Sequence, residues 1–304
     1  AHSKSDDDRD QDEINEYVKK DPLNVFSVNN ASSYQDILAS VNKRIEEVVL
    51  KSDKESELSL DLYLTEKKIT ENGEYVPLVN INERVISRIN CFFDETLEKD
   101  KKLMFIGEDV LSPYGGAFKA AKNLSKKYPD NIITTPISEQ AITGLANGLA
   151  LGGYKPYLEL MFGDFITLSM DQIINHASKF HHMYNKKVKC PVVIRTPMGG
   201  GRGYGPTHSQ TLDKFLVGIE NITVVAINSF IDPKLIYDRI YQSEEHPVIV
   251  LENKVDYGRT VGAKSQDNYL LERTSQGYPV VKCSPKAVEP TLTIVSYGGI
   301  ASDV

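Results

Sequence analysis

Between about residue 79 and residue 253, short apolar segments alternate with longer amphipathic ones, and this alternation is the feature that most restricts the fold. The amphipathic segments, such as 82–100, 115–130 and 231–243, have the spacing of apolar residues typical of helices. The apolar segments have the length and composition of buried strands and are KLMFIGEDV (102–110), NIITTPIS (131–138), KPYLELMF (155–162), CPVVIRTP (190–197), NITVVAIN (221–228) and HPVIVLEN (246–253). Buried strands that alternate with helices form a parallel sheet with helices on both faces, and ligands bind beyond the carboxyl ends of its strands. We therefore expect an α/β fold built on a doubly wound parallel sheet.

The segments on either side of the alternation define the domain organisation. Residues 1–13 carry six acidic residues and are expected to form a solvated loop, whereas 32–55 has helical spacing with Ser33 available as the cap. PTLTIVSYGG (290–299) has the composition of a further strand. Because a strand without partners cannot bury itself, we expect the chain to be a piece of a longer protein. The expected divisions are a helical tail (1–60), a linker (61–78), the alternating domain (79–263), a second linker (264–288) and the truncated start of another domain (289–304).

Composition excludes several classes of function. The net charge is −7 and the basic residues are dispersed among acidic ones, so no nucleic-acid partner is expected. No apolar run approaches the roughly 18 residues of a membrane span, so no membrane partner is expected. The acidic start is the reverse of a signal peptide, and Cys91, Cys190 and Cys283 lie far apart without CxxC spacing. These features indicate a reducing, cytoplasmic location without a disulfide framework.

Glu139 follows Ser138 at the expected start of a helix, in TTPISEQAITGLANGLALGG. Burying a carboxylate among apolar residues costs free energy unless a hydrogen-bond donor or an opposite charge binds it. One interpretation is a first-turn acid favoured by the helix dipole, worth roughly 0.3–1 kcal/mol, and the other is a buried group that addresses a ligand. Gly144, Gly148 and Gly152 recur every four residues and share one helix face. Because each glycine costs about 1 kcal/mol in a helix interior, we expect another helix or chain to pack closely against that face.

The glycine-rich loop MGGGRGYGPTHS (198–209) contains neither GxGxxG nor a Lys-Ser/Thr pair, so it matches neither a Rossmann nor a P-loop nucleotide site. A mobile loop without a ligand is an equal alternative. His208 lies at the expected start of a helix, SQTLDKFL (209–216), and both a structural and a catalytic role are open for it. His176, His181 and His182 lack the i, i+4 spacing that lets two imidazoles share a metal, so no metal site is expected there.

Five segments together resemble one protein family, and they are GEDV…YGGAFKAAKNLSKKYPD, TTPISEQAITGLANGLALGG, MFGDF…DQIINHASK, GPTHSQ and HPVIVLENKVDYG. Over residues 79–263 they resemble the beta subunit of the thiamin-diphosphate-dependent E1 component of 2-oxo acid dehydrogenase complexes. This resemblance implies a transketolase-like pyrimidine-binding domain. LTIVSYGGIASDV resembles the opening of that subunit's C-terminal domain, and AHSKSDDDRDQDEINEYVKKDPL resembles the end of the alpha subunit. The two matches imply a fused alpha–beta chain, of which this sequence is the middle portion.

The resemblance assigns a cofactor role to Glu139. In the family, the glutamate of the SE motif faces N1′ of the aminopyrimidine ring, where a carboxyl group stabilises the imino tautomer that removes the proton from thiazolium C2. A dry site strengthens that hydrogen bond, which accounts for the apolar company of Glu139. Phe165 falls where the family stacks an aromatic ring on the pyrimidine. Met161 and Ile137 fall where the family lines the same ring.

The resemblance also assigns catalytic histidines and a cation site. His208 matches the active-site histidine of the beta side and His2 that of the alpha side, and in the family these help to hold substrate and move protons. The carbonyls around Tyr241, Glu244 and His246 match a loop that binds a monovalent cation. Family alpha subunits hold magnesium and the diphosphate with a Gly-Asp-Gly motif that does not occur in this sequence. We therefore expect the magnesium site to lie outside this chain.

The function implied by the resemblance is that of a 2-oxo acid dehydrogenase E1. Such an enzyme decarboxylates a 2-oxo acid on thiamin diphosphate and passes the acyl group to a lipoyl-bearing E2. The implied partners are an E1 alpha region, a second copy of this chain and E2, and we expect this piece to be inactive alone. Two alternatives are a transketolase-like ketol transferase and a non-catalytic interaction module of the same fold. GPTHSQ and the alpha-like amino end favour E1, but the sequence does not name the 2-oxo acid.

Overall fold

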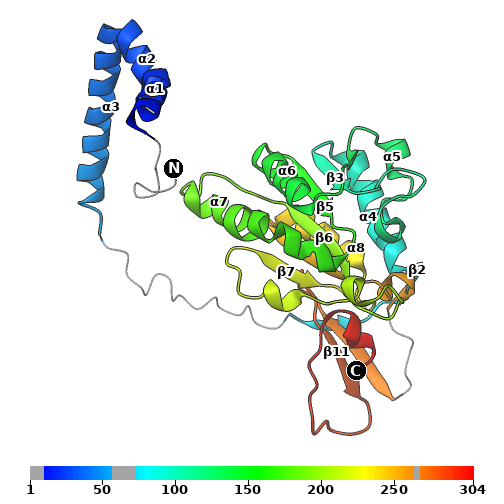
Figure 1. Cartoon of the computed structure of the whole chain (residues 1–304). Coiled ribbons are helices and arrows are strands. Elements are labelled where there is room, and N and C mark those ends of the chain that lie inside the picture. Colours follow the sequence, from blue (N-terminus) through cyan, green and yellow to red (C-terminus); the bar gives the residue numbers. More distant parts are fainter. Residues whose placement is uncertain (1–9, 57–72, 263–267) are drawn as a thin grey trace. The chain divides into compact units, whose positions relative to one another are not determined.

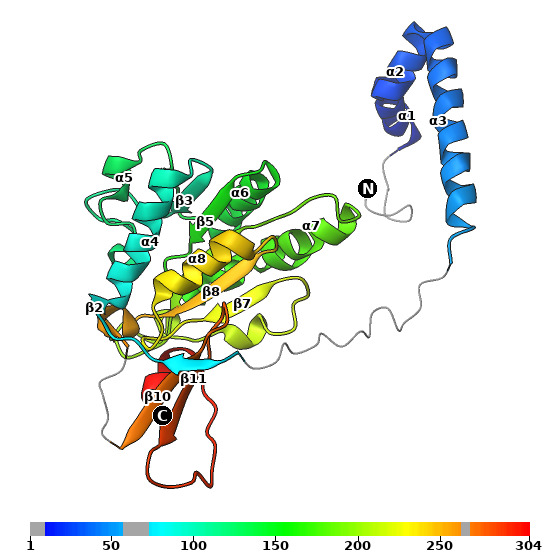
Figure 2. The same ribbon diagram turned by 180° about the vertical axis from the view of Figure 1, so that it is seen from behind.

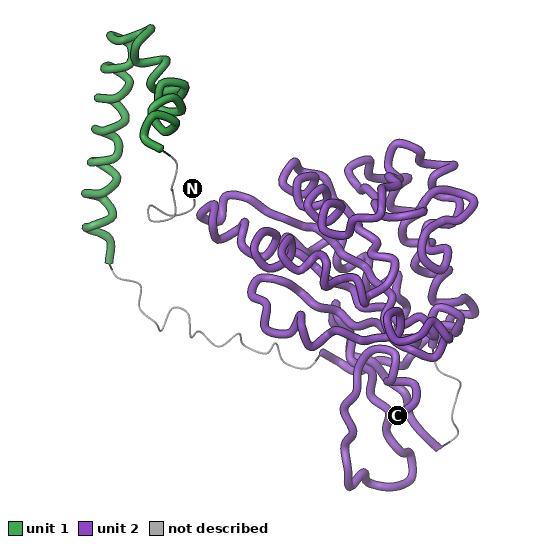
Figure 3. Tube along the Cα trace, in the orientation of Figure 1, with its two compact units in different colours: residues 1–70 green, residues 71–304 purple. Residues whose placement is uncertain are grey.

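The computed structural model describes residues 10–56, 73–262 and 268–304 (Figure 1). The chain divides into two compact units, residues 1–70 and residues 71–304, which Figure 3 colours separately. All of the predicted site residues except His2 belong to the second unit. His2 lies outside the described residues.

The described part of the first unit consists of three helices, α1 (Gln11–Lys20), α2 (Pro22–Asn29) and α3 (Ala31–Ser52). The carboxylate of Asp10 caps α1 by accepting the backbone N–H groups of Asp12 and Glu13, both at 2.8 Å. The loop predicted at the amino end is therefore wrong for residues 11–13, while 1–9 lie outside the description. The prediction that Ser33 caps the long helix is also wrong, because α3 already begins at Ala31.

Six parallel strands form the main sheet of the second unit and confirm the predicted doubly wound architecture. Their order across the sheet is β4 (Ile132–Thr134), β3 (Leu103–Gly107), β5 (Lys155–Glu159), β6 (Val193–Met198), β8 (Val248–Asn253) and β7 (Thr223–Ala226). The register pairs Leu103 with Lys155, and Val193 with Val248. All six carboxyl ends therefore meet at one edge of the sheet.

Helices cover both faces of this sheet, as the opposite views in Figures 1 and 2 show. Neighbouring strand residues alternate between two apolar clusters: Phe105 belongs to one and Ile106 to the other. The first cluster includes residues of α4 (Val85–Lys99) and α8 (Pro233–Ser243). The second includes residues of the elements α6 (Glu139–Leu151), the 3₁₀ helix η3 (Gly163–Ser169) and the π-helix η4 (Gln172–Ala177), which continues into α7 (Ser178–Met183).

The helix predicted over 115–130 is wrong. The structure has a single 3₁₀ turn, η2 (Ala117–Lys119), and a short helix, α5 (Leu124–Lys127), with left-handed backbone at Asn123 and within η2. A buried carboxylate on β5 holds this segment, since Glu159 accepts the backbone N–H of Ala117 at 2.5 Å. A Cβ at Gly116 would lie 2.5 Å from the same carboxylate oxygen, so glycine is required there. The positive φ of Phe118, Lys119 and Asn123 is incompatible with one continuous right-handed helix over this segment.

The helix predicted over 209–216 is also wrong, because this segment contains only the 3₁₀ turn η6 (Asp213–Phe215). His208 instead ends a preceding 3₁₀ turn, η5 (Pro206–His208). The carboxylate of Asp164 accepts both the backbone N–H of Gln210, at 3.1 Å, and its side-chain amide, at 2.9 Å. A tertiary contact therefore determines the backbone after His208.

Small antiparallel sheets flank the main one. β1 (Tyr75–Pro77), β10 (Tyr269–Thr274) and β11 (Val281–Pro285) pair in the order β1-β10-β11, so the two predicted linkers contain regular structure. β2 (Ile81–Arg84) pairs with β9 (Thr260–Val261), which delays the start of α4 to Val85.

The strand predicted over 290–299 is wrong. Its residues Ile294 and Val295 are 66% and 89% exposed, and the regular element at this end is the 3₁₀ helix η8 (Gly298–Ser302). No strand in the described ranges pairs with the segment. No helix in those ranges combines the length and apolarity needed to cross a membrane.

Candidate functional site

Glu139, the first residue of α6, has only 7% of its surface exposed. Its backbone carbonyl accepts hydrogen bonds from the hydroxyls of Thr143, at 2.6 Å, and Ser169, at 3.0 Å. The bond from Ser169 ties the start of α6 to η3, the element that carries Phe165. Across the described ranges no hydrogen bond to the Glu139 carboxylate is present, and its oxygens are not among the fully buried atoms without a partner, so they keep some exposure and can accept a hydrogen bond from a ligand.

A second buried carboxylate, Glu108, directly follows β3 and is absent from the residues predicted above. Its Oε1 atom is buried without a hydrogen-bond partner among the described residues. Burial, followed by the charges of Glu139 and Asp109, raises the pKa of Glu108. The sequence signal was an acidic residue placed directly after a buried strand, at the edge where ligands bind.

His208 lies against two aromatic rings. Its half-buried imidazole is 4.8 Å from the Phe162 ring and 5.2 Å from the Phe165 ring, measured between centroids, and both contacts are edge to face. The structure thus brings together Phe165 and His208, which come from distant segments. Met161 is half-buried beside them in sequence, whereas Ile137 is 81% exposed. Ile137 adds little packing to this chain, so its side chain is available to a ligand.

A buried network of ion pairs lies behind the aromatic rings that contact His208. Arg195 on β6 has no exposed surface, and its guanidinium binds the carboxylates of Glu159 and Glu252. Glu159 also holds the backbone of Ala117, as described above. The network therefore fixes the segment that carries Phe118. The ring of Phe118 contacts those of Phe162 and Tyr204.

The three residues predicted for a monovalent cation lie at the other edge of the sheet. Tyr241 and Glu244 are at the carboxyl end of α8 and His246 precedes β8, where the parallel strands begin. The Tyr241 hydroxyl donates to Asp100 at 2.5 Å, and Glu244 accepts from Tyr278 at 2.7 Å. The cation site depends on carbonyls and stays a prediction. Within the described part of the chain, no cluster of three or more His, Cys, Asp and Glu side chains is arranged to hold a metal.

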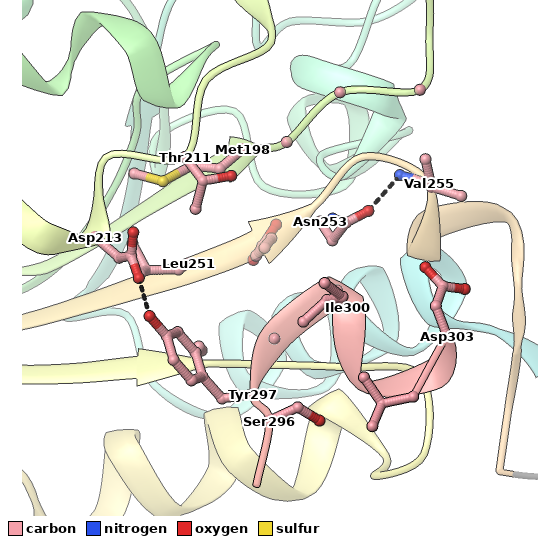
Figure 4. Close-up of a pocket in the computed structure, with 18 of the residues that line it drawn as sticks. Met198, Thr211, Asp213, Leu251, Asn253, Val255, Ser296, Tyr297, Ile300 and Asp303 are labelled. Carbon is pink, nitrogen blue, oxygen red and sulfur yellow. Dashed lines mark hydrogen bonds between the residues drawn. The ribbon is translucent and has the colours of Figure 1, made fainter. Parts of the chain in front are cut away.

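A cavity of about 760 Å³ opens at the carboxyl end of β8 (Figure 4). It lies between the start of the glycine-rich loop and residues 294–304. On its walls the Tyr297 hydroxyl donates to Asp213, and Asn253 Oδ1 accepts the backbone N–H of Val255 at 2.8 Å. The cavity is separate from the predicted site, since its lining includes none of the described residues Ile137, Glu139, Met161, Phe165 and His208.

Most of the second unit matches a known protein family. Residues 87–260, more than half of the chain, match the family model described as the pyrimidine-binding domain of transketolase. A solved split-gene transketolase, described as an inactive beta4 tetramer, has a TM-score of 0.44 and 18% identity over 57% of this chain and 51% of its own.

Relatives with curated names are E1 beta subunits. The 2-oxoisovalerate dehydrogenase subunit beta of Bacillus subtilis is 31% identical over 214 residues, which cover 70% of this chain and 63% of that protein. The mitochondrial pyruvate dehydrogenase E1 component subunit beta of Bos taurus is 40% identical over 172 residues, which cover 56% of this chain and 47% of that protein. The chain therefore spans about half to two thirds of the length of these relatives.

Proposed function

Since this chain belongs to the transketolase pyrimidine-binding domain family and its domain is E1 beta-like, we propose that it supplies the pyrimidine half of a thiamin diphosphate site. The observation that carries the proposal is the Glu139 carboxylate, which is buried at a helix start with no hydrogen-bond donor from the rest of the described chain. A largely buried carboxylate whose oxygens have no protein donor and keep some exposure is placed to accept a hydrogen bond from a ligand.

The residues around Glu139 fit an aminopyrimidine ring. Phe165, on the element hydrogen-bonded to the start of α6, offers an aromatic face for stacking. Met161 and the exposed Ile137 offer apolar contacts for the ring edge. These residues combine one hydrogen-bonding carboxylate with apolar side chains around it, which is the usual composition of a cofactor pocket.

Each residue of this site has a distinct task in the proposal. When bound, the cofactor supplies the electron sink that makes decarboxylation of a 2-oxo acid possible. Glu139 would accept or share a hydrogen bond at ring atom N1′, and its charge, after burial, raises the pKa of neighbouring Glu108. His208, held among aromatic rings, orients substrate and moves a proton to or from it.

At the level of the whole enzyme, we assign the chain to an E1 component that oxidatively decarboxylates a 2-oxo acid and acylates a lipoyl-bearing E2. An E1 alpha region supplies the magnesium and diphosphate half, since this sequence has no Gly-Asp-Gly motif. His2, outside the described residues, is assigned to the same active site from the alpha side. The curated names of the relatives, both E1 beta subunits, support this assignment.

Turnover by the intact protein tests the proposal. With thiamin diphosphate, magnesium and a panel of 2-oxo acids, we expect carbon dioxide release coupled to reduction of dichlorophenolindophenol, and acylation of added lipoyl-E2. Ketose transfer without decarboxylation would replace the proposal with a transketolase-like activity. No turnover of any substrate in the presence of E2 would favour a non-catalytic module.

A further inference from the structure

The loop before His208 has little intrinsic stiffness. Gly199, Gly201, Gly203 and Gly205 all have positive φ, between 76° and 87°. Glycine gives the unfolded chain more freedom than other residues, so ordering such a loop costs conformational entropy. A catalytic histidine at its end requires a restraint from elsewhere in the fold.

Lys254 provides one such restraint. It directly follows β8 and has no exposed surface. Its ammonium donates to the carbonyl of Gly199 at 3.1 Å and to the carbonyl of His208 at 2.6 Å. One ammonium group therefore bridges Gly199, near the start of the loop, and His208, near its end. The ammonium also lies 5.2 Å from the centroid of the Phe162 ring, the same ring that contacts His208.

Asp164 restrains the chain on the other side of His208. This residue of η3 is 6% exposed, and its Oδ1 accepts the backbone N–H and the side-chain amide of Gln210. Its Oδ2 is buried without a hydrogen-bond donor from the described residues. Burial lowers the pKa of Lys254, and the charge of Asp164 opposes that change. The charge of Asp164 thus favours the ionised form of Lys254.

We propose that Lys254 and Asp164 are positioning residues for His208. Lys254 donates to the carbonyl of His208, and Asp164 accepts the backbone N–H of Gln210, two residues later. The imidazole of His208 is therefore held against the rings of Phe162 and Phe165 in one orientation. Both restraints come from elements at the carboxyl edge of the sheet rather than from the loop. The kinetic consequence rests on the proposed function, whereas the restraint of the loop does not.

Trypsin cleavage after Arg202, an exposed residue inside the loop, measures the restraint directly in the intact protein. Lys254→Met should accelerate this cleavage by about tenfold or more relative to cleavage after exposed Lys187, the scale expected for losing a charge-assisted hydrogen bond. Lys254→Arg should restore most of the protection. The matched control is Lys234→Met, which removes an ammonium bonded to Asp238 at 2.8 Å on α8. Equal acceleration in Lys254→Met and Lys234→Met would overturn the proposal.

NMR of the histidine ring gives a second readout that a general loss of stability does not move. In protein labelled at histidine, the Cε1–H signal of His208 is shifted by the two aromatic rings, and Asp164→Asn and Lys254→Arg should move it partway toward the free-residue position. These milder variants keep the proposal testable if Lys254→Met fails to fold. An unmoved His208 signal in both would overturn it.

Kinetics separate this inference from the proposed function. In the active enzyme, Lys254→Met and His208→Ala should lower kcat by similar factors, and the double variant should be no slower than His208→Ala alone. If Lys254→Met opens the loop but kcat is unchanged in both Lys254→Met and His208→Ala, Lys254 still restrains the loop, and His208 takes no part in catalysis. Multiplicative losses in the double variant would show that Lys254 acts independently of His208 and would overturn the kinetic part.

Discussion

Glu108 and Glu139 are two buried carboxylates beside the start of α6, and after burial itself the charge of Glu139 is the main cause that raises the pKa of Glu108. β3 delivers the first and the start of α6 the second. Two like charges near one another are unfavourable, so a proton or a ligand donor shared by the pair stabilises the site. Substitution of Glu108 therefore tests the stability of the fold, and substitution of Glu139 tests the proposed function.

Glu108 should give the protein a recognisable pH dependence. In the unfolded chain it titrates near its ordinary value of 4.5, and in the folded protein its pKa is higher. Between these two values the folded state binds more protons than the unfolded state, so the free energy of unfolding falls as pH rises through the window. Glu108→Gln removes this titration, and urea unfolding from below pH 4.5 to neutral pH should show a smaller fall. Glu98→Gln, at an exposed position of α4, is the control and should keep the parent slope.

If Glu139 binds the aminopyrimidine as proposed, Glu139→Gln should cause a large rate loss in the intact protein. An amide cannot favour the imino tautomer of the aminopyrimidine as a carboxyl group does. Exchange of the cofactor C2 proton, followed by NMR, should slow by about 10²–10⁴, the range for lost general acid–base catalysis. Glu98→Gln should exchange at the parent rate. Parent-like exchange in Glu139→Gln would leave Glu139 as a helix-start acid favoured by the dipole.

Arg195→Met should destabilise the fold strongly. The guanidinium is fully buried between the carboxylates of Glu159 and Glu252, and Tyr237 also donates to Glu252. Removing it leaves two buried carboxylates without their cation, which typically costs about 3–5 kcal/mol. Denaturant unfolding measures the loss, and the exposed Arg84→Met should change stability by no more than about 0.5 kcal/mol. A loss below about 1 kcal/mol in Arg195→Met would mean that the network relaxes or admits water.

Gly148→Leu tests the predicted association through α6. A Cβ at Gly148 meets no atom within 4 Å, whereas one at Gly144 meets Gln172 at 3.2 Å and Gly152 forms the C-cap. Leucine at the open position should therefore leave the fold of one chain intact. If a second copy packs there, the added side chain overpacks the contact at a cost of about 1–3 kcal/mol. Sedimentation should then show the variant dissociating at concentrations where the parent and Gly148→Ala stay associated, and identical oligomeric states would contradict the prediction.

The parallel sheet and the helix start at Glu139 were predictable because they depend on local apolar periodicity. The errors occur where a buried charge from a distant segment determines the backbone. Glu159 holds Ala117 in one segment wrongly predicted as a helix, and Asp164 holds Gln210 in the other. Neither contact has a signature in a single sequence. For the same reason, nothing in ENKVDYG indicates that the ammonium of Lys254 lies on the carbonyl of His208.

The chain alone should bind thiamin diphosphate weakly. Most of the cofactor's charge is on its diphosphate, which proteins meet with magnesium and backbone donors, and this sequence lacks the family's Gly-Asp-Gly motif. What this chain offers is one hydrogen bond to Glu139, worth about 0.5–1.5 kcal/mol net, and stacking on Phe165, worth about 0.5–1.5 kcal/mol beyond area burial. Apolar contacts with Met161 and Ile137 add to these, but association also costs at least about 4 kcal/mol of lost freedom. Titration calorimetry with magnesium should therefore give millimolar affinity at best, and Glu139→Gln should weaken it further. Micromolar binding by this chain would mean that its own residues hold the diphosphate, and the division of the site between two regions would then be wrong.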